Sequence, residues 1–324
     1  FKARLVAKGF NQRHGIDYQE TFAPTTSKTA LRTMLAAATA EGMHIRQMDV
    51  VTAFLYAELD NDSIFVKPPQ ITGLFQKDEV LHLRKALYGL KQAPRLWNTK
   101  MDAWLRDNGF SAAKTEPCVY TRVHGPADKV WLAIYVDDII IAANNDKRLD
   151  DFRRRIVATL KIKDLGTPQH CLGIHIKYDR DKKQMELNQQ QYIKDMLIKF
   201  GMQDCKAAST PLPSGYKDTP TVRGVEPPDL PYRSLVGSLL HVSTTTRPDI
   251  AASCSILTRH MSCFDASHFT TAKHVLRYLK GTIDYSIKFD GEVYDADLVA
   301  YTDASFESDP DTGRSSPRAS RGPE

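Results

Sequence analysis

Two neighbouring aspartates, Asp137 and Asp138, interrupt a strongly apolar stretch of the chain. Residues 130–134 read VWLAI and residues 139–143 read IIIAA. Each run has the length and the β-branched or aromatic content of a buried strand, so the pattern predicts a hairpin with the two carboxylates at its turn. Aspartate is common in turns, and a purely structural turn accounts for the pair equally well.

The cost of burying charge weighs against the purely structural explanation. Ionised carboxylates beside apolar strands are unfavourable unless they are paired or bound to a metal. A third carboxylate from another strand would complete a two-metal site for phosphoryl transfer. Asp49 lies near the end of the alternating segment 44–50 and is the candidate for this third carboxylate, although a lone aspartate at such a position is usually a helix cap or a turn former. We expect Asp49, Asp137 and Asp138 to meet at one edge of a sheet.

Length and composition place few limits on function. The 324 residues allow two or more domains, and a net charge of +5 permits a polyanionic partner without requiring one. The five cysteines are scattered and lack a CxxC pair, which favours a reducing compartment and argues against a structural zinc. Without an apolar run of membrane-spanning length or a signal peptide, we expect an intracellular protein with no membrane partner. The first residue, Phe1, suggests a cut from a longer polypeptide.

Periodicity and caps predict the remaining elements. Strands are expected at residues 44–50, 64–66, 80–83 and 298–305 and in a hairpin over 170–177 and 184–188; helices are expected at 28–41, 94–108, 146–160, 191–200, 231–243, 248–262 and 267–280. Residues 206–231 are rich in Pro, Ser, Thr and Gly and are expected to be a linker.

Two segments have alternative interpretations at this stage. Lys2 and Arg4 recur at strand period in residues 2–8, which suits either a charged edge strand or a clamp for a triphosphate. Phe54, five residues after Asp49, is either a core residue or a contact to substrate. Gly89 permits the close approach of a backbone to a ligand.

Four motifs, in order, resemble those of a Ty1/copia-type retrotransposon reverse transcriptase. They are residues 2–10 (KARLVAKGF), 49–55 (DVVTAFL), 87–97 (LYGLKQAPRLW) and 135–138 (YVDD). The resemblance continues through residues 163–166, 172–174, 232–240, 246–250 and 276–282. Any one of these motifs is weak evidence, whereas the ordered set is specific and covers nearly the whole chain to about residue 312.

The resemblance implies an α+β right-hand polymerase fold, with palm and partial fingers and a helical thumb or connection segment. Fingers and palm would occupy residues 1–205, a linker 206–230, and the thumb or connection 231–290. Residues 291–324 would be the truncated start of an RNase H-like domain with a disordered tail. Asp303 is the one RNase H carboxylate expected there, so no RNase H activity is expected from this chain.

The implied activity is RNA-directed DNA synthesis by two-metal nucleotidyl transfer from dNTPs to a primer 3′-hydroxyl. Asp49, Asp137 and Asp138 would be the catalytic residues and would hold two Mg²⁺ ions, with Mn²⁺ as a substitute. The partners would be an RNA template and a DNA primer, or an RNA–DNA heteroduplex, together with dNTPs. The setting would be a cytoplasmic virus-like particle or the nucleus; the sequence gives no oligomeric state.

The resemblance also assigns supporting roles. The expected substrate-binding residues are Lys2 and Arg4 at the triphosphate, Phe54 against the ribose 2′-position, Tyr88, Gly89 and Lys91 at the incoming nucleotide, and Tyr135 at the primer terminus. Lys273, Arg277 and Lys280 give the helix at 267–280 a basic side that would follow the heteroduplex backbone, with salt-dependent binding that tolerates any sequence.

Two other functions remain open from the sequence. The chain could be a catalytically inactive, truncated retroelement relic with at most weak nucleic-acid binding, and metal-dependent primer extension distinguishes this alternative. It could also be another palm-fold enzyme, such as a nucleotide cyclase, which would consume nucleoside triphosphate without a template. The motif at 87–97 and the helices after residue 231 argue against a cyclase.

Overall fold

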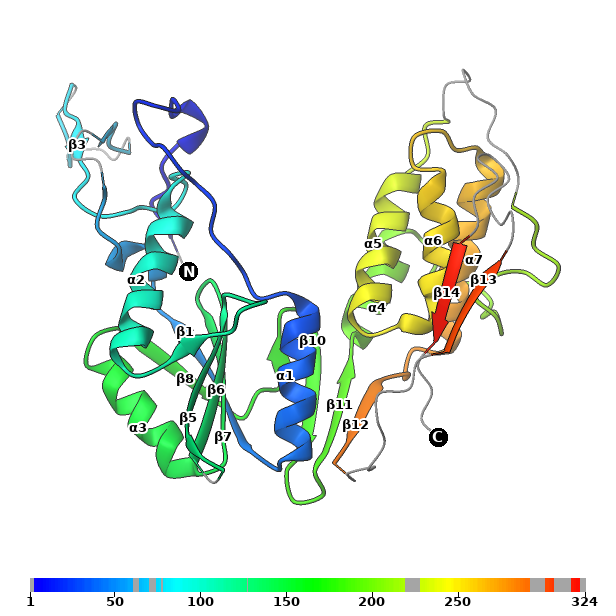
Figure 1. Cartoon of the computed structure of the whole chain (residues 1–324). Helices are drawn as coiled ribbons and strands as arrows, with labels where there is room; N and C mark the ends of the chain where they lie inside the picture. Colours follow the sequence, from blue (N-terminus) through cyan, green and yellow to red (C-terminus); the bar gives the residue numbers. More distant parts are fainter. Residues whose placement is uncertain are drawn as a thin grey trace. The chain divides into compact units, whose positions relative to one another are not determined.

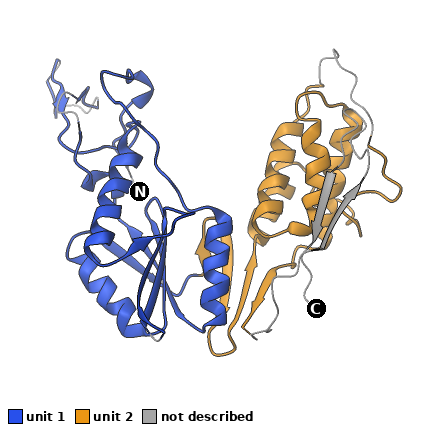
Figure 2. Cartoon of the chain, in the orientation of Figure 1, with its two compact units in different colours: residues 1–168 blue, residues 169–324 orange. Residues whose placement is uncertain are grey.

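The computed structural model describes two compact units, residues 1–168 and residues 169–324 (Figure 2). Within them it describes residues 3–60, 64–69, 74–76, 78–126, 128–218 and 228–291, and the backbone alone of 301–305 and 316–320. The boundary at Pro168 and Gln169 falls earlier than the predicted one at residue 205. The reason is that the hairpin and helix after residue 169 pair and pack with later parts of the chain.

Unit 1 is built on a six-stranded antiparallel sheet in the order β4-β5-β6-β7-β1-β8 (Figure 1). Its strands are β4 (Ser111–Ala112), β5 (Val119–Gly125), β6 (Asp128–Tyr135), β7 (Asp138–Ala143), β1 (His44–Val50) and β8 (Ile162–Gly166). β1 therefore lies in the sheet between β7 and β8, although both of these strands come much later in the sequence. This insertion places the end of β1 beside the predicted aspartate turn.

In the described part of unit 1, three helices cover this sheet, with α2 (Ala93–Asp107) and α3 (Asp146–Val157) on one face and α1 (Lys28–Ala40) on the other (Figure 1). The face under α2 and α3 carries the main core, which includes Trp97, Phe152 and Ile141. Ser27 and Asn145 cap α1 and α3 with side-chain oxygens that accept backbone N–H groups, as their residue types favour. Because strand side chains alternate, Asp49 and Asp138 lie on the face opposite this core.

Short elements complete unit 1. They are the 3₁₀ turns η1 (Gly9–Asn11) and η2 (Ala53–Tyr56) and the two-stranded pair β2 (Phe65–Val66) and β3 (Leu81–His82). The charged edge strand that was one of two interpretations of residues 2–8 does not form where the structure describes the segment, from residue 3 onward. Alternating charge is not sufficient for a strand, because a strand also needs a neighbour for its backbone groups.

Unit 2 begins with a four-stranded sheet in the order β12-β11-β10-β9. Its strands are β9 (His170–Cys171), β10 (Ile174–Asp179), β11 (Gln184–Asn188) and β12 (Ile287–Asp290). The continuous strand predicted over residues 170–177 is wrong, because Leu172 and Gly173 have positive φ and turn the chain between β9 and β10. The hairpin of β10 and β11 is as predicted.

The helices of unit 2 pack around their own core. They are α4 (Gln190–Lys199), α5 (Tyr232–Thr245), η3 (Pro248–Ile250), α6 (Ala251–Arg259) and α7 (Ala266–Gly281). Ile193, Leu239 and Leu276 are among the buried residues of this core, which joins α4 to the three later helices.

The predicted linker is partly packed. Residues 206–218 have no regular structure, yet Ala208 N–H donates to the Arg277 carbonyl at 3.3 Å, and Arg277 Nε donates to the Lys206 carbonyl at 2.7 Å. Residues 219–227 lie outside the described part. The Pro- and Ser-rich composition marks the absence of helix or strand and does not exclude packing.

At the C-terminal end β13 (Tyr301–Ser305) pairs antiparallel with β14 (Ser316–Ser320), with Asp303 opposite Arg318. A strand at 316–320 differs from the tail without regular structure that the composition predicts. Residues 306–315 and 321–324 lie outside the described part of the chain. Among the residues described, no helix has the length and apolarity that crossing a membrane requires.

Candidate active site

The turn between β6 and β7 is held in a conformation that its sequence alone would not favour. Val136 has φ of +58°, in the left-handed region that β-branched residues rarely adopt. Trp97 Nε1, from α2, donates a hydrogen bond to the Val136 carbonyl at 2.7 Å. The Trp97 side chain is buried in the core, so α2 anchors the turn that carries Asp137.

The pairing of β1 with β7 places the third aspartate beside this turn. Asp49 and Asp138 are directly opposite one another in the ladder, which puts their Cβ atoms about 4.5–5.5 Å apart on one face. The next residue, Val50, donates its N–H to the Asp137 carbonyl at 2.9 Å. The three aspartates therefore come together at one end of two adjacent strands.

The cluster of aspartates carries negative charge that no described residue neutralises by an ion pair. Burial raises the pKa of Asp138; a hydrogen bond from Gln47 at 3.3 Å opposes the rise, while the charges of Asp137 and Asp49 add to it. Lys163 is opposite Asp49 in the β1–β8 pair, but its side chain is exposed. A bound cation would relieve this repulsion.

The donor set suits a hard cation, because all three side chains offer carboxylate oxygen. Their carboxylate oxygens do not all lie within 4.8 Å of one another; among the described residues one triplet meets that distance, and it lies in unit 2. The backbone thus brings the three residues together, and side-chain rotation would be needed to close them on metal ions.

An aromatic pair follows the aspartates. Phe54 lies in η2, directly after β1, and its ring meets the Tyr88 ring edge-on with centroids 4.9 Å apart. The Arg4 guanidinium lies 5.6 Å from the Tyr88 ring centroid. Burial raises the pKa of Tyr88, and the nearby charge of Asp137 adds to the rise. Arg4, Phe54 and Tyr88 therefore form one group within electrostatic reach of the aspartates.

Two glycines let the Arg4 segment approach this group. Ala7 N–H donates to the Tyr88 carbonyl at 2.7 Å. A Cβ atom on Gly89 would lie 2.1 Å from the Ala7 carbonyl oxygen, and one on Gly9 would lie 1.9 Å from the Gly89 carbonyl oxygen. Gly89 also has φ of +91°. The close approach predicted at Gly89 is thus to the chain itself.

The other predicted substrate residues are dispersed. Tyr135 is opposite Asp138 in the β6–β7 pair and is 39% exposed. Lys91 Nζ donates to the Gln12 carbonyl at 3.3 Å and to the Tyr18 hydroxyl at 3.2 Å, so it fastens the loop near residue 12. Lys2 lies outside the described residues.

The predicted nucleic-acid residues of α7 are engaged with their own chain. Arg277 binds the Lys206 carbonyl, and Lys280 Nζ donates to the Cys205 carbonyl at 2.6 Å. Lys273 Nζ lies 5.7 Å from the centroid of the Phe269 ring. The sequence could not show these bonds, because the accepting carbonyls lie some 70 residues earlier in the chain.

A model of the reverse transcriptase (RNA-dependent DNA polymerase) family matches residues 1–214, well over half of the chain. The chain belongs to this reverse transcriptase family. The Ty1/copia-type resemblance predicted from the motifs is thereby confirmed.

Three relatives of this reverse transcriptase domain are transposon proteins. The Pol polyprotein of transposon TNT 1-94 from Nicotiana tabacum is 35% identical over 98% of the chain, and that of transposon RE2 from Arabidopsis thaliana is 36% identical over 96%. The chain spans only 24% and 21% of their respective lengths. A transposon Ty5-1 protein of Saccharomyces cerevisiae is 33% identical over 80% of the chain and 83% of its own length.

Two residues of this candidate site were not predicted from the sequence. Gln47 was detectable, since it lies two residues before Asp49 on a strand and must share its face. The role of Trp97 in anchoring the aspartate turn was not detectable, because nothing in the motif at 87–97 indicates a bond to residue 136.

Proposed function

We propose that this chain is an RNA-directed DNA polymerase that transfers a nucleotide from a dNTP to a primer 3′-hydroxyl. The observation that carries the proposal is the pairing of Asp49 with Asp138, with Asp137 in the adjoining turn, in a member of the reverse transcriptase family. A cluster of carboxylates without countercharge is what a two-metal site requires before its ions bind.

In this proposal Asp49 and Asp137 would be the main carboxylates that hold the metal ions, and Asp138 would be an additional ligand. Two bound Mg²⁺, or Mn²⁺, ions would lower the pKa of the primer hydroxyl and neutralise the leaving pyrophosphate. The task of the chain is to hold the carboxylates ionised at one sheet edge. Gln47 assists, since its hydrogen bond to Asp138 favours the charged form of that carboxylate.

The group made of Arg4, Phe54 and Tyr88 is proposed to receive the incoming nucleotide. Arg4 supplies positive charge for the triphosphate. The Phe54 ring, braced edge-on by Tyr88, would occupy the space that a ribose 2′-oxygen needs. Lys2, in the same segment, is proposed to assist Arg4, and Tyr135 to support the primer end.

The template and primer are proposed to bind partly through α7. Arg277 and Lys280 donate to backbone carbonyls, and a cation held in this way still attracts phosphate. Their contribution is then electrostatic, and binding should weaken as salt rises without discriminating among sequences.

Primer extension tests the proposal. Purified chain with oligo(dT) on poly(rA) should incorporate dTTP only when Mg²⁺ or Mn²⁺ and the template are both present. Consumption of nucleoside triphosphate without template would indicate a cyclase-like enzyme. Heteroduplex binding without incorporation would indicate an inactive nucleic-acid-binding relic, and either result would overturn the proposal.

A further inference from the structure

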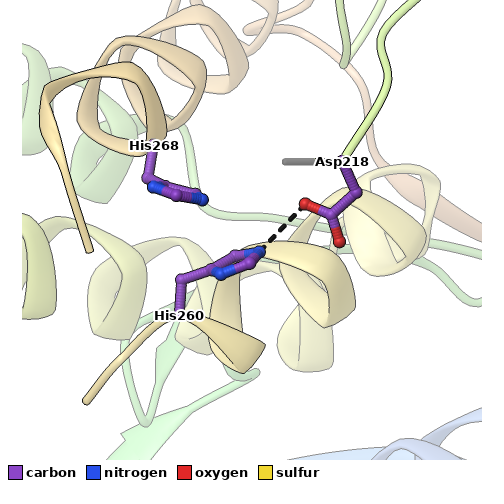
Figure 3. Close-up of side chains that lie close together, drawn as sticks. All are labelled: Asp218, His260 and His268. Atoms are coloured by element: carbon purple, nitrogen blue, oxygen red, sulfur yellow. Dashed lines mark hydrogen bonds and ion pairs between the residues drawn. The ribbon is translucent and has the colours of Figure 1, made fainter. Parts of the chain in front are cut away.

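Unit 2 contains a second cluster of metal-ligating residue types, Asp218, His260 and His268 (Figure 3). His260 follows the last turn of α6, and His268 lies in the first turn of α7. Asp218 comes from the packed segment that ends at the edge of the described residues. One ligand atom from each lies within 4.8 Å of the other two.

Both imidazoles are almost fully removed from solvent. His260 and His268 are each 1% exposed, and their ring centroids are 4.0 Å apart with planes inclined by 36°. His260 Nε2 lies 2.9 Å from Asp218 Oδ1, and Figure 3 shows both rings directed toward the Asp218 carboxylate.

The cluster leaves polar atoms without hydrogen bonds. His268 Nε2, His260 Nδ1 and Asp218 Oδ2 are buried and have no hydrogen-bond partner among the described residues. Asp218 Oδ2 does lie 3.5 Å from Arg259 Nη1, an ion-pair distance. Buried polar atoms without a partner are unfavourable, so three of them on neighbouring side chains call for a ligand.

The surroundings orient the ring atoms for such a ligand. His268 Nδ1 is 2.8 Å from Oδ1 of Asp265, the N-cap of α7, and 3.2 Å from the Asp265 backbone nitrogen, whose N–H donates to it in the tautomer that leaves Nδ1 unprotonated. When Nδ1 donates its proton to that carboxylate, the lone pair lies on Nε2, which faces the cluster. A carboxylate behind the ring is the usual partner of a metal-binding histidine. Tyr216 donates its hydroxyl to Asp218 Oδ1 at 3.2 Å and so orients the third ligand.

We propose that His260, His268 and Asp218 bind one divalent transition-metal ion, with Zn²⁺ the best fit. Two imidazole nitrogens and a carboxylate oxygen suit Zn²⁺ better than Mg²⁺, which prefers oxygen alone. Two ligands about 2.0–2.1 Å from a tetrahedral ion lie about 3.3 Å apart, so the His260–Asp218 pair would open by a few tenths of an ångström. Solvent would supply the fourth ligand.

The metal would tie the segment at 216–218 to the adjoining ends of α6 and α7. This site is separate from the three aspartates of unit 1 and does not depend on the polymerase activity. The absence of CxxC pairs, taken from the sequence as evidence against a structural zinc, excludes only a cysteine-based site.

Metal binding by the whole chain tests the proposal. Chelator-treated protein is titrated with Zn²⁺, and separately with Co²⁺, in millimolar Mg²⁺ so that oxygen-only sites are occupied. We expect one tightly bound Zn²⁺ per chain and the intense visible absorption of tetrahedral Co²⁺. Variants His268→Asn and His260→Asn remove one imidazole each, and the asparagine at 268 can still bond the Asp265 cap.

Controls separate this site from others. His170→Asn alters the His170–His175 pair, whose centroids are 4.9 Å apart. Asp137→Asn alters the unit 1 cluster. Both should bind Zn²⁺ as the wild type does, whereas each ligand variant should bind more weakly by over about 100-fold.

Two results would overturn the proposal. One is a wild type that binds no stoichiometric Zn²⁺ or Co²⁺, and the other is binding that survives in both histidine variants. Should these variants fail to fold, Asp218→Asn decides, because its amide can still bond His260 and its loop position carries little of the core. Zn²⁺ should raise the unfolding temperature of the wild type and not that of Asp218→Asn; equal shifts would exclude the site.

Discussion

Replacement of Gly89 by alanine should separate the Arg4 segment from the aromatic pair without unfolding unit 1. The new Cβ would lie 2.1 Å from the Ala7 carbonyl oxygen, where no Cβ can remain. The two backbones must then move apart by roughly 1 Å or more to restore van der Waals contact. The hydrogen bond from Ala7 N–H to the Tyr88 carbonyl, 2.7 Å long, would be lost.

The expected loss of folding stability in Gly89→Ala has two parts. Alanine at φ of +91° loses about 1–2 kcal/mol through backbone strain. The lost hydrogen bond adds about 0.5–1.5 kcal/mol. Gly15→Ala supplies the matched control, because Gly15 has φ of +82° but nothing within 4 Å of its Cβ position. The control should lose stability through backbone strain alone, so the free energies of unfolding of the two variants should differ by about 1 kcal/mol.

Urea unfolding followed by tryptophan fluorescence measures this difference in unit 1, because all three tryptophans (97, 104 and 131) lie there. In primer extension the KM for dNTP should rise in Gly89→Ala and stay unchanged in Gly15→Ala, because Arg4 would leave its place over Tyr88. Equal stability and equal KM in the two variants would refute the close approach and its role in positioning Arg4.

Three further outcomes are expected. Phe54→Val should raise the use of ribonucleotides relative to deoxynucleotides at least tenfold in kcat/KM, about 1.4 kcal/mol per tenfold; an unchanged ratio with lower stability would make Phe54 a core residue only. Arg247→Met removes a 1%-exposed guanidinium that bonds Asp249 at 2.7 Å and the Thr282 carbonyl at 2.9 Å. The substitution should lower the free energy of unfolding by about 3 kcal/mol, the low end for a broken buried ion pair, because Asp249 is 32% exposed. Urea unfolding followed by far-UV circular dichroism measures this loss, and a loss under about 1 kcal/mol would contradict the prediction. Burial alone would raise the pKa of Asp249, but Arg247 outweighs burial and lowers it. The stabilisation is therefore present above the unfolded pKa of about 3.9 and lost as pH falls below it; Asp249→Asn should flatten this acid limb, and an unchanged limb would argue against the pair.

The aspartate hairpin was predictable from sequence because its determinants are local. Two apolar runs around a pair of carboxylates predict a turn wherever the chain folds, and β6 and β7 have that form. The neighbour of β7 was not predictable from pattern alone. Pairing with β1 joins residues 49 and 138, and nothing in an alternating strand specifies a partner so distant.

Two features of unit 2 could not be seen in the sequence, for the same reason. The hydrogen bonds that hold the basic side of α7 were not foreseen because their acceptors, the carbonyls of residues 205 and 206, are backbone groups that any sequence carries. The cluster in unit 2 went unnoticed because His260 and His268 gain meaning only when Asp218 is brought beside them. Long-range contacts made by loops leave no periodic trace in a sequence.

Single-turnover extension by Asp137→Asn tests the central claim most directly. The variant should bind the heteroduplex with a Kd within about threefold of the wild type and extend the primer at least about 10³-fold more slowly, as expected when charge is removed from the reacting centre. Asp107→Asn makes the same charge change at the exposed last residue of α2 in unit 1 and should extend normally. Extension by Asp137→Asn at the rate of Asp107→Asn would contradict the assignment of a metal-binding aspartate site to the β6–β7 turn.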